Sequence, residues 1–243
     1  MTLISVHLPK TAGTSFKASL ATHFGDRYRD DYGDQAISQS QHERFAAAMS
    51  AGMLIAQQGL DGIDCVHGHF LPLKYQSLDT RGTLTFVTWM REPVARLLSH
   101  YDYWQESYDE KTAASHHRQV MEEGWTLERF CLSEKFRNIY TQYLWCFPLE
   151  RFAFIGITEH YDEDMREFSE RFLTSDISPQ HLNATKYGLS RHSVDEAFLD
   201  EVRAFHAADM RLYQRALQLR LERNRGNRTH RQENAVAPFK VCT

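Results

Sequence analysis

Four short apolar runs divide the chain, and a longer segment of mixed polarity separates each from the next. The run at residues 83–90 is the clearest, because its β-branched and aromatic residues are typical of a strand buried in a sheet. The other predicted strands cover residues 3–8, 63–66 and 152–157.

Between these runs, apolar residues recur at the three- or four-residue spacing that predicts helices. In the segment 41–58 this spacing places Phe45, Met49 and Met53 on one apolar face. Because strands alternate with helices, we expect an α/β fold with a central parallel sheet flanked by helices in three layers. One further helix is predicted over the segment that carries Phe16, Leu20 and Phe24, and another begins near residue 94. Two or three helices are predicted within 113–146, and the last two cover 162–173 and 193–222.

Composition and charge are those of one globular domain, predicted over residues 1–222. The chain has 243 residues, of which 42% are hydrophobic and 25% charged. A formal net charge of −4 gives no overall positive field, so we expect no nucleic-acid partner. Residues 223–243 lose the apolar period and are predicted to form a flexible basic tail, or less readily a polyanion-binding arm.

The sequence also favours a cytoplasmic location. No apolar run approaches the ~20 residues of a membrane span. A predicted strand begins almost at the first residue, which leaves no room for a signal peptide. Four cysteines without a paired spacing indicate reduced thiols.

The first predicted strand leads into the segment PKTAGTS at residues 9–15, and a helix follows. A strand, a loop and a helix in this order gather free main-chain N–H groups and the positive end of a helix around an anion. Lys10 adds a point charge suited to phosphate. The segment therefore predicts a P-loop-type fold, although the Walker pattern has its lysine after the last glycine, whereas Lys10 precedes Gly13. The loop candidates for cofactor binding are Lys10, Thr11, Ala12, Gly13, Thr14 and Ser15.

A second candidate site follows the clearest strand. Arg91 stands at its carboxyl end, where open α/β sheets bind ligands, and Ser99 lies two turns into the next predicted helix. The guanidinium and the hydroxyl could converge on one phosphate. The alternative for Arg91 alone is an ion pair with a neighbouring carboxylate.

Two histidines, His67 and His69, flank Gly68 after the second predicted strand. An imidazole near its ordinary pKa is suited to remove a proton from a hydroxyl at neutral pH. A packed or surface histidine is the usual alternative for such a pair. Two imidazoles without a third ligand make a poor zinc site, so we expect no metal.

These segments together resemble the sulfotransferases that use 3′-phosphoadenosine 5′-phosphosulfate (PAPS). PKTAGTS resembles their 5′-phosphosulfate loop, and the segment from Arg91 through Ser99 to Tyr101 resembles their 3′-phosphate motif, R-[DE]-P-…-R-…-S-x-Y. The HGH segment resembles the Y-H-G-H of carbohydrate sulfotransferases related to heparan sulfate uronosyl 2-O-sulfotransferase. In that family the second histidine resembles the catalytic base, which would be His69 here, with His67 in support.

The resemblance covers about residues 5–186 and implies further roles. The segment FIGITE at 154–159 resembles a strand-to-helix junction of the family, where we expect Thr158 to cap the helix. Asn183 and Lys186 fall where relatives use a polar loop to cover the nucleotide. The sequence is shorter than those of the Golgi enzymes, and we expect neither their membrane anchor nor their disulfide framework. The residues that contact the acceptor in those enzymes therefore cannot be carried over to this sequence.

The activity that the resemblance implies is a PAPS-dependent O-sulfotransferase, with a carbohydrate as the first choice of hydroxyl acceptor and no metal. Lys10 would neutralise charge on the departing oxygen. Two other classes stay open: a P-loop kinase or NTPase, and a noncatalytic polyanion-binding protein.

Overall fold

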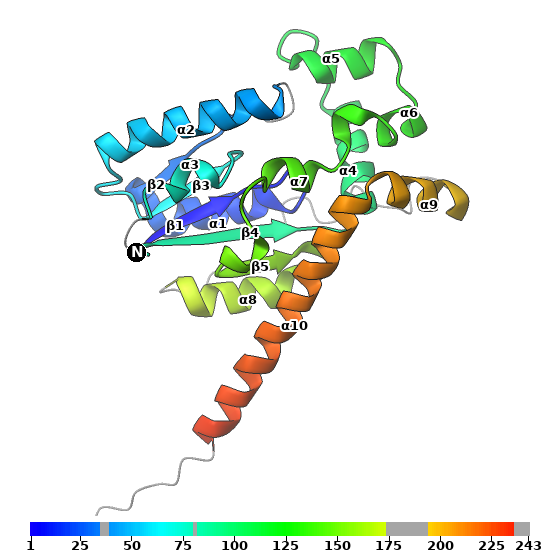
Figure 1. The fold of residues 1–243 in the computed structure, drawn as a ribbon. Coiled ribbons are helices and arrows are strands. Elements are labelled where there is room, and N and C mark those ends of the chain that lie inside the picture. Colours follow the sequence, from blue (N-terminus) through cyan, green and yellow to red (C-terminus); the bar gives the residue numbers. More distant parts are fainter. Residues whose placement is uncertain (35–38, 80–81, 174–193, 236–243) are drawn as a thin grey trace, which may run out of the picture.

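The computed structural model describes residues 1–34, 39–79, 82–173 and 194–235. Its centre is a sheet of five parallel strands in the order β2-β3-β1-β4-β5, which confirms the predicted α/β class (Figure 1). The strands are β1 Thr2–Val6, β2 Tyr28–Asp30, β3 Cys65–Gly68, β4 Leu84–Met90 and β5 Phe154–Ile157.

Helices cover both faces of the sheet, which makes the predicted three layers. On one face α1 and α8 pack, with Phe16 and Phe168 against Leu3 of β1. On the other face α7 and α10 pack, with Tyr140 and Ala216 in the same core cluster as Ile4. The α-helices are α1 Gly13–Phe24, α2 Gln41–Gln58, α3 Leu73–Gln76, α4 Pro93–Glu106, α5 Ser115–Glu122, α6 Leu127–Cys131, α7 Ile139–Tyr143, α8 Tyr161–Phe172, α9 Glu196–Phe205 and α10 Ala207–Ala235, and the 3₁₀ turns are η1 Gly25–Arg27, η2 Glu134–Phe136, η3 Leu149–Arg151 and η4 Thr158–His160.

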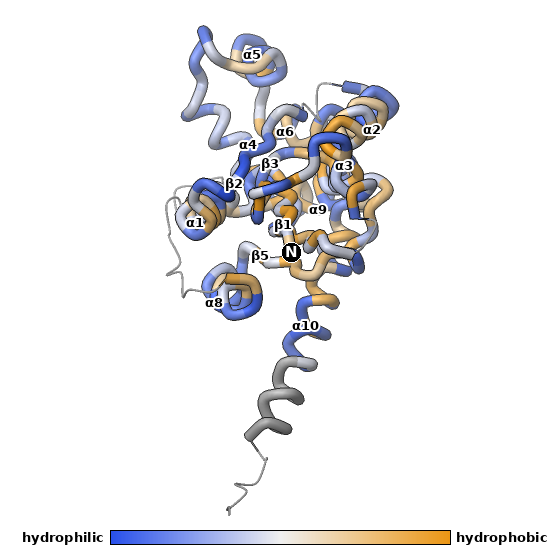
Figure 2. Tube along the Cα trace, turned by 90° about the vertical axis from the view of Figure 1, so that its left-hand side faces the viewer, coloured by the Kyte–Doolittle hydropathy of each residue, from blue (hydrophilic) through white to orange (hydrophobic). Residues whose placement is uncertain are grey.

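A separate group of helices lies beyond the carboxyl ends of the strands. There α4, α5, α6 and α9 enclose a third core cluster that includes Leu97, Phe130 and Val202 (Figure 1). Figure 2 shows hydrophobic positions gathered around the strands and hydrophilic ones on the part of α10 that extends away from the sheet. The helical group therefore forms a wall beside the strand ends.

The register of β1 decides which segments meet at the carboxyl edge of the sheet. Val6 pairs with Gly68 of β3 on one side and with Thr88 of β4 on the other. The hydroxyl of Thr88 also donates to the main-chain oxygen of Val6 at 2.8 Å. As a result, the loops after β1, β3 and β4 open at the same edge, where α/β sheets bind ligands.

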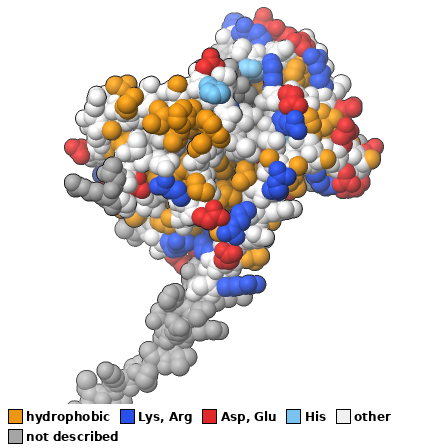
Figure 3. Space-filling model, in the orientation of Figure 1, with side chains coloured by type: hydrophobic (Ala, Val, Ile, Leu, Met, Phe, Trp, Pro, Cys, Tyr) orange, Lys and Arg blue, Asp and Glu red, His pale blue; other side chains and the backbone are white. Residues whose placement is uncertain are grey.

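Helix α2 has the predicted bounds but buries a face other than the apolar one that its spacing suggested. Arg44, Ala48 and Gly52 are buried, whereas Phe45 and Met53 are 37% and 58% exposed. A Cβ on Gly52 would lie 2.6 Å from a main-chain oxygen of α3, so this small-residue face permits a close approach. Figure 3 shows the hydrophobic side chains that are left at the surface in this region.

The segment 193–222, predicted as one helix, contains two. Helix α9 ends at Phe205 and α10 begins at Ala207, with a turn at His206 between them. Its buried ring accepts from the main-chain N–H of Asn138 at 3.2 Å and donates to the oxygen of Cys131 at 2.8 Å. The second helix also continues to Ala235, past the predicted end at 222, and Arg223 forms an ion pair with Glu167 of α8 at 2.8 Å. The predicted tail, 223–243, therefore starts within a helix.

Candidate active site

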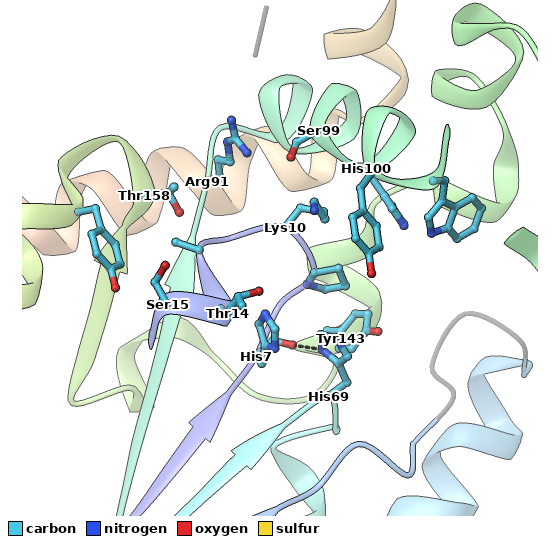
Figure 4. A pocket seen from close by; sticks show the side chains of 16 residues that line it. His7, Lys10, Thr14, Ser15, His69, Arg91, Ser99, His100, Tyr143 and Thr158 are labelled. Carbon is cyan, nitrogen blue, oxygen red and sulfur yellow. Dashed lines mark hydrogen bonds between the residues drawn. The ribbon is translucent and has the colours of Figure 1, made fainter. Parts of the chain in front are cut away.

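A cavity of about 540 Å³ lies at the carboxyl ends of β1, β3 and β4 (Figure 4). The loop after β1, the start of α1 and one side of α4 form its walls. Eight of the predicted site residues line it, namely Lys10, Ala12, Gly13, Thr14, Ser15, His69, Arg91 and Ser99. The structure thus brings together groups that the sequence places up to 89 positions apart (residues 10 and 99).

The loop after β1 has an unusual main-chain conformation. Lys10 and Ala12 have φ angles of 65° and 66°, in the left-handed region that non-glycine residues adopt at a cost of about 1–3 kcal/mol each. The hydroxyl of Thr11 donates to the oxygen of Leu8 at 2.8 Å, which tightens the turn, so Thr11 is buried and does not line the cavity. Turns of this kind direct successive N–H groups at anions.

The start of α1 supplies a second anion-binding feature. No side chain caps the helix at Ala12, and its first turn contains no acidic residue. The positive end of the helix dipole is therefore open at Gly13, Thr14 and Ser15, all of which line the cavity. A Cβ on Gly13 would lie 1.6 Å from Nε2 of His7, so a side chain at this position requires the His7 ring or the loop to move.

Two cationic side chains from different segments line the same cavity. Lys10 comes from the loop, and Arg91 follows the end of β4 (Figure 4). Burial, and next the charge of Arg91, lower the pKa of Lys10 to about 8. The ammonium group lies 4.0 Å from the centre of the Tyr103 ring on α4. Cations held close to one another in this way favour the entry of a polyanion between them.

His69 faces the cavity in a defined tautomer. Its Nδ1 lies 2.6 Å from the main-chain oxygen of His7, and because a carbonyl only accepts, Nδ1 carries the hydrogen (Figure 4). Nε2 of the neutral ring is then left with a lone pair. Burial lowers the pKa of His69 below its ordinary value, so the ring is neutral at pH 7 and can accept a proton.

His67 lies behind the cavity rather than in its wall. The side chain is 1% exposed, its Nδ1 lies 2.8 Å from the hydroxyl of Ser5, and burial lowers its pKa to about 3. The ring of His7 stacks on both other imidazoles, with centroid distances of 5.0 Å to His67 and 4.3 Å to His69. The alternation across Gly68 therefore separates the two histidines, and His67 supports the ring stack.

Sequence reasoning missed several residues of the cavity. His7 follows the last residue of β1 and stands two positions before the PKTAGTS segment, and this nearness was a usable signal. Tyr103 follows Ser99 by one helical turn, so the face of α4 that carries Ser99 could have predicted it. The remaining unpredicted lining residues are Pro9, His100, Trp104, Tyr143, Thr158 and Tyr161.

Of three further predictions, one is wrong and two concern residues outside those that the structure describes. Thr158 does not cap a helix: it begins the turn η4, and its hydroxyl donates to the main-chain oxygen of Met90 at 3.1 Å. The side chain thus joins the ends of β5 and β4 instead. Asn183 and Lys186 lie outside the described residues.

Two features are absent from the described residues, a metal-binding cluster and a membrane-spanning helix. No group of three or more His, Cys, Asp or Glu side chains in this part of the chain could hold a metal ion. None of its helices has the length and apolar character needed to cross a membrane.

This chain was compared with protein-family models, curated proteins and solved structures. No protein-family model matches the chain, and no curated protein matches its sequence. A crystal structure of a sulfotransferase from Alicyclobacillus acidocaldarius is similar with a TM-score of 0.46 and 14% sequence identity, over 87% of this chain and 93% of that one.

Proposed function

We propose that this protein is a sulfotransferase that transfers the sulfuryl group of PAPS to a hydroxyl acceptor, with a carbohydrate as the first candidate. The observation that carries the proposal is the convergence of four features on one cavity. These are an anion-binding loop, the cations Lys10 and Arg91, the helix hydroxyl of Ser99, and a neutral imidazole, His69, with a lone pair on Nε2.

The cofactor would lie along the cavity, from the loop after β1 to Arg91 and α4. The N–H groups of residues 11–15 and the positive end of α1 would hold the 5′-phosphosulfate. Arg91 on the β4–α4 connection and Ser99 on α4, eight positions apart, would hold the 3′-phosphate through charge-assisted bonds. Asn183 and Lys186 remain candidates for covering the nucleotide.

A protein catalyses sulfuryl transfer mainly by positioning the reactants and by stabilising the charge that develops in the transition state. The acceptor oxygen would attack sulfur in line and give its proton to Nε2 of His69. A new O–S bond forms as the bond from sulfur to the bridging oxygen breaks, which releases 3′-phosphoadenosine 5′-phosphate (PAP). Lys10 would stabilise the negative charge that grows on the bridging oxygen.

The other two classes fit the cavity less well. A kinase or NTPase of the P-loop type holds Mg²⁺ with a carboxylate at a strand end, but β4 leads to Arg91 and none of the described lining residues is Asp or Glu. A noncatalytic polyanion-binding protein would have no use for an imidazole held in the tautomer of a base.

The direct test incubates the purified protein with radiolabelled PAPS and a panel of neutral sugars, sulfated glycans, phenols and small alcohols. We expect label in at least one acceptor and stoichiometric formation of PAP. PAPS that stays intact with every acceptor, in a protein that binds PAP, would instead favour the noncatalytic class.

A further inference from the structure

The main chain of Arg91 is held by one buried side chain from a different part of the fold. The hydroxyl of Tyr140, on α7, accepts from the N–H of Arg91 at 3.0 Å and donates to its carbonyl oxygen at 2.5 Å. Tyr140 is fully buried and does not line the cavity. A single hydroxyl therefore fixes both polar main-chain groups of the residue that directly follows β4.

The neighbouring peptide groups of this turn are held in the same way. Oε1 of Glu159 accepts from the N–H of Glu92 at 2.9 Å, and the hydroxyl of Thr158 donates to the oxygen of Met90 at 3.1 Å. We refer to Tyr140, Thr158 and Glu159 as the turn clamp. The main-chain positions of three consecutive residues, 90–92, are thus fixed by side chains from α7 and η4 in addition to strand pairing.

Helix α10 supports two members of the turn clamp. Asp209 is buried and accepts from the N–H of Tyr140 at 2.9 Å and of Thr141 at 3.0 Å, which fixes the start of α7. One helical turn later, the hydroxyl of Tyr213 donates to Oε2 of Glu159 at 3.0 Å. The beginning of α10 is therefore connected to the turn of Arg91 by two separate chains of hydrogen bonds.

We propose that Tyr140 and Glu159 are positioning residues that set the recognition of the nucleotide's 3′-phosphate by placing the Arg91 guanidinium. The inference rests on the proposed function, because it concerns the group that Arg91 would bind. A charge-assisted hydrogen bond weakens steeply as its angle and distance depart from ideal values. A small rotation of the main chain at residue 91, amplified along the arginine side chain, is enough to lose it.

The first test replaces Tyr140 by Phe, which keeps the buried ring and removes the hydroxyl. Calorimetry then measures the dissociation constants of PAP and AMP, whose ratio reports the contribution of the 3′-phosphate alone. We expect the PAP preference to fall about three- to tenfold, the effect of losing one or two neutral hydrogen bonds in the support. The matched control is Tyr75→Phe, because Tyr75 is also buried but its hydroxyl bonds Asp31 at 2.7 Å, away from this turn.

The second test uses Glu159→Ala, since this exposed side chain can be removed without a cavity in the core. Its control is Glu150→Ala, an exposed glutamate that pairs with Arg215 of α10 at 2.8 Å but does not contact the turn. We expect Glu159→Ala to lower the preference for PAP and Glu150→Ala to leave it unchanged.

Combining each variant with Arg91→Ala separates positioning from general destabilisation. If the turn clamp acts through Arg91, neither Tyr140→Phe nor Glu159→Ala lowers the PAP preference further in the Arg91→Ala background.

Two results would count against the inference in different ways. An unchanged PAP preference in folded Glu159→Ala and Tyr140→Phe, beside a strong preference in the unmodified protein, would overturn the inference and leave the proposed function standing. If Tyr140→Phe does not fold, Glu159→Ala decides alone. Equal binding of PAP and AMP by the unmodified protein would overturn the proposed function, and the inference with it.

Discussion

His69 donates the hydrogen on its Nδ1 to the main-chain oxygen of His7 at 2.6 Å. Because that oxygen can only accept, the main chain of His7, just after β1, determines which nitrogen of His69 keeps a lone pair. His67 differs in this respect, since its partner is the hydroxyl of Ser5, which can donate or accept. Of the two histidines in the HGH segment, only His69 combines a fixed tautomer with a place at the cavity.

Replacement of His69 by Ala should therefore remove the base and keep the nucleotide site. We expect PAP affinity within about twofold of the unmodified protein and a loss of transfer of roughly 10²–10⁴-fold, the usual contribution of a positioned general base. Calorimetry and the radiolabel assay on the same preparation measure both quantities. Near-normal turnover in the folded variant would exclude His69 as the base.

The pH dependence of transfer follows from the environment of His69. Burial lowers its pKa below the ordinary 6.5, and the ring must be neutral to accept a proton. Activity should therefore rise with pH through a group that titrates below 6.5. A kcat/KM profile between pH 4.5 and 7.5 measures this, and a midpoint above 6.5 would contradict the environment described for His69.

Lys10 gives the opposite limb of the profile. Its pKa is lowered to about 8, and the charged form is the one that stabilises the departing oxygen, so activity should fall as pH rises past about 8. Bound PAPS would raise this pKa, which shifts the fall in kcat to higher pH than the fall in kcat/KM.

Replacement of Lys10 by Ala tests its role in the reaction. We expect kcat to decrease more than the affinity for PAPS, because the interaction belongs to the transition state. An intact kcat with a raised KM would make Lys10 a ground-state anchor.

Gly13 is expected to tolerate no side chain. The Cβ of Ala at this position would lie 1.6 Å from Nε2 of His7, so either the ring stack or the loop must move. Gly13→Ala should abolish PAP binding and lower the melting temperature. The control is Gly226→Ala on α10, where a Cβ would have no neighbour within 4 Å, and which should be neutral or stabilising by up to about 1 kcal/mol. Binding of PAP by Gly13→Ala at normal affinity would show that the loop conformation does not matter.

The sequence predicted the strands and the loop of the site because both are local patterns. β4 and the PKTAGTS loop are recognisable within fifteen residues each, and Arg91 follows directly from the end of a strand. β2 escaped prediction because it has only three residues at a sheet edge, with two of its side chains exposed.

Features that depend on distant contacts could not be predicted. The exposed side of α2 follows from how closely Gly52 approaches α3, and the break at His206 follows from bonds to Cys131 and Asn138. Likewise, the support of Arg91 by Tyr140 joins residues 49 positions apart. Such relationships arise from tertiary packing, which overrides the local spacing of apolar residues.

The central claim is that the cavity binds a 3′-phosphorylated adenosine nucleotide, and calorimetry with PAP and AMP tests it most directly. We expect clear binding of PAP and much weaker binding of AMP. Arg91→Ala should remove most of the difference, since a charged hydrogen bond to phosphate contributes about 1.5–3 kcal/mol, or roughly 10- to 150-fold in affinity. Equal affinities for PAP and AMP in the unmodified protein would contradict the account.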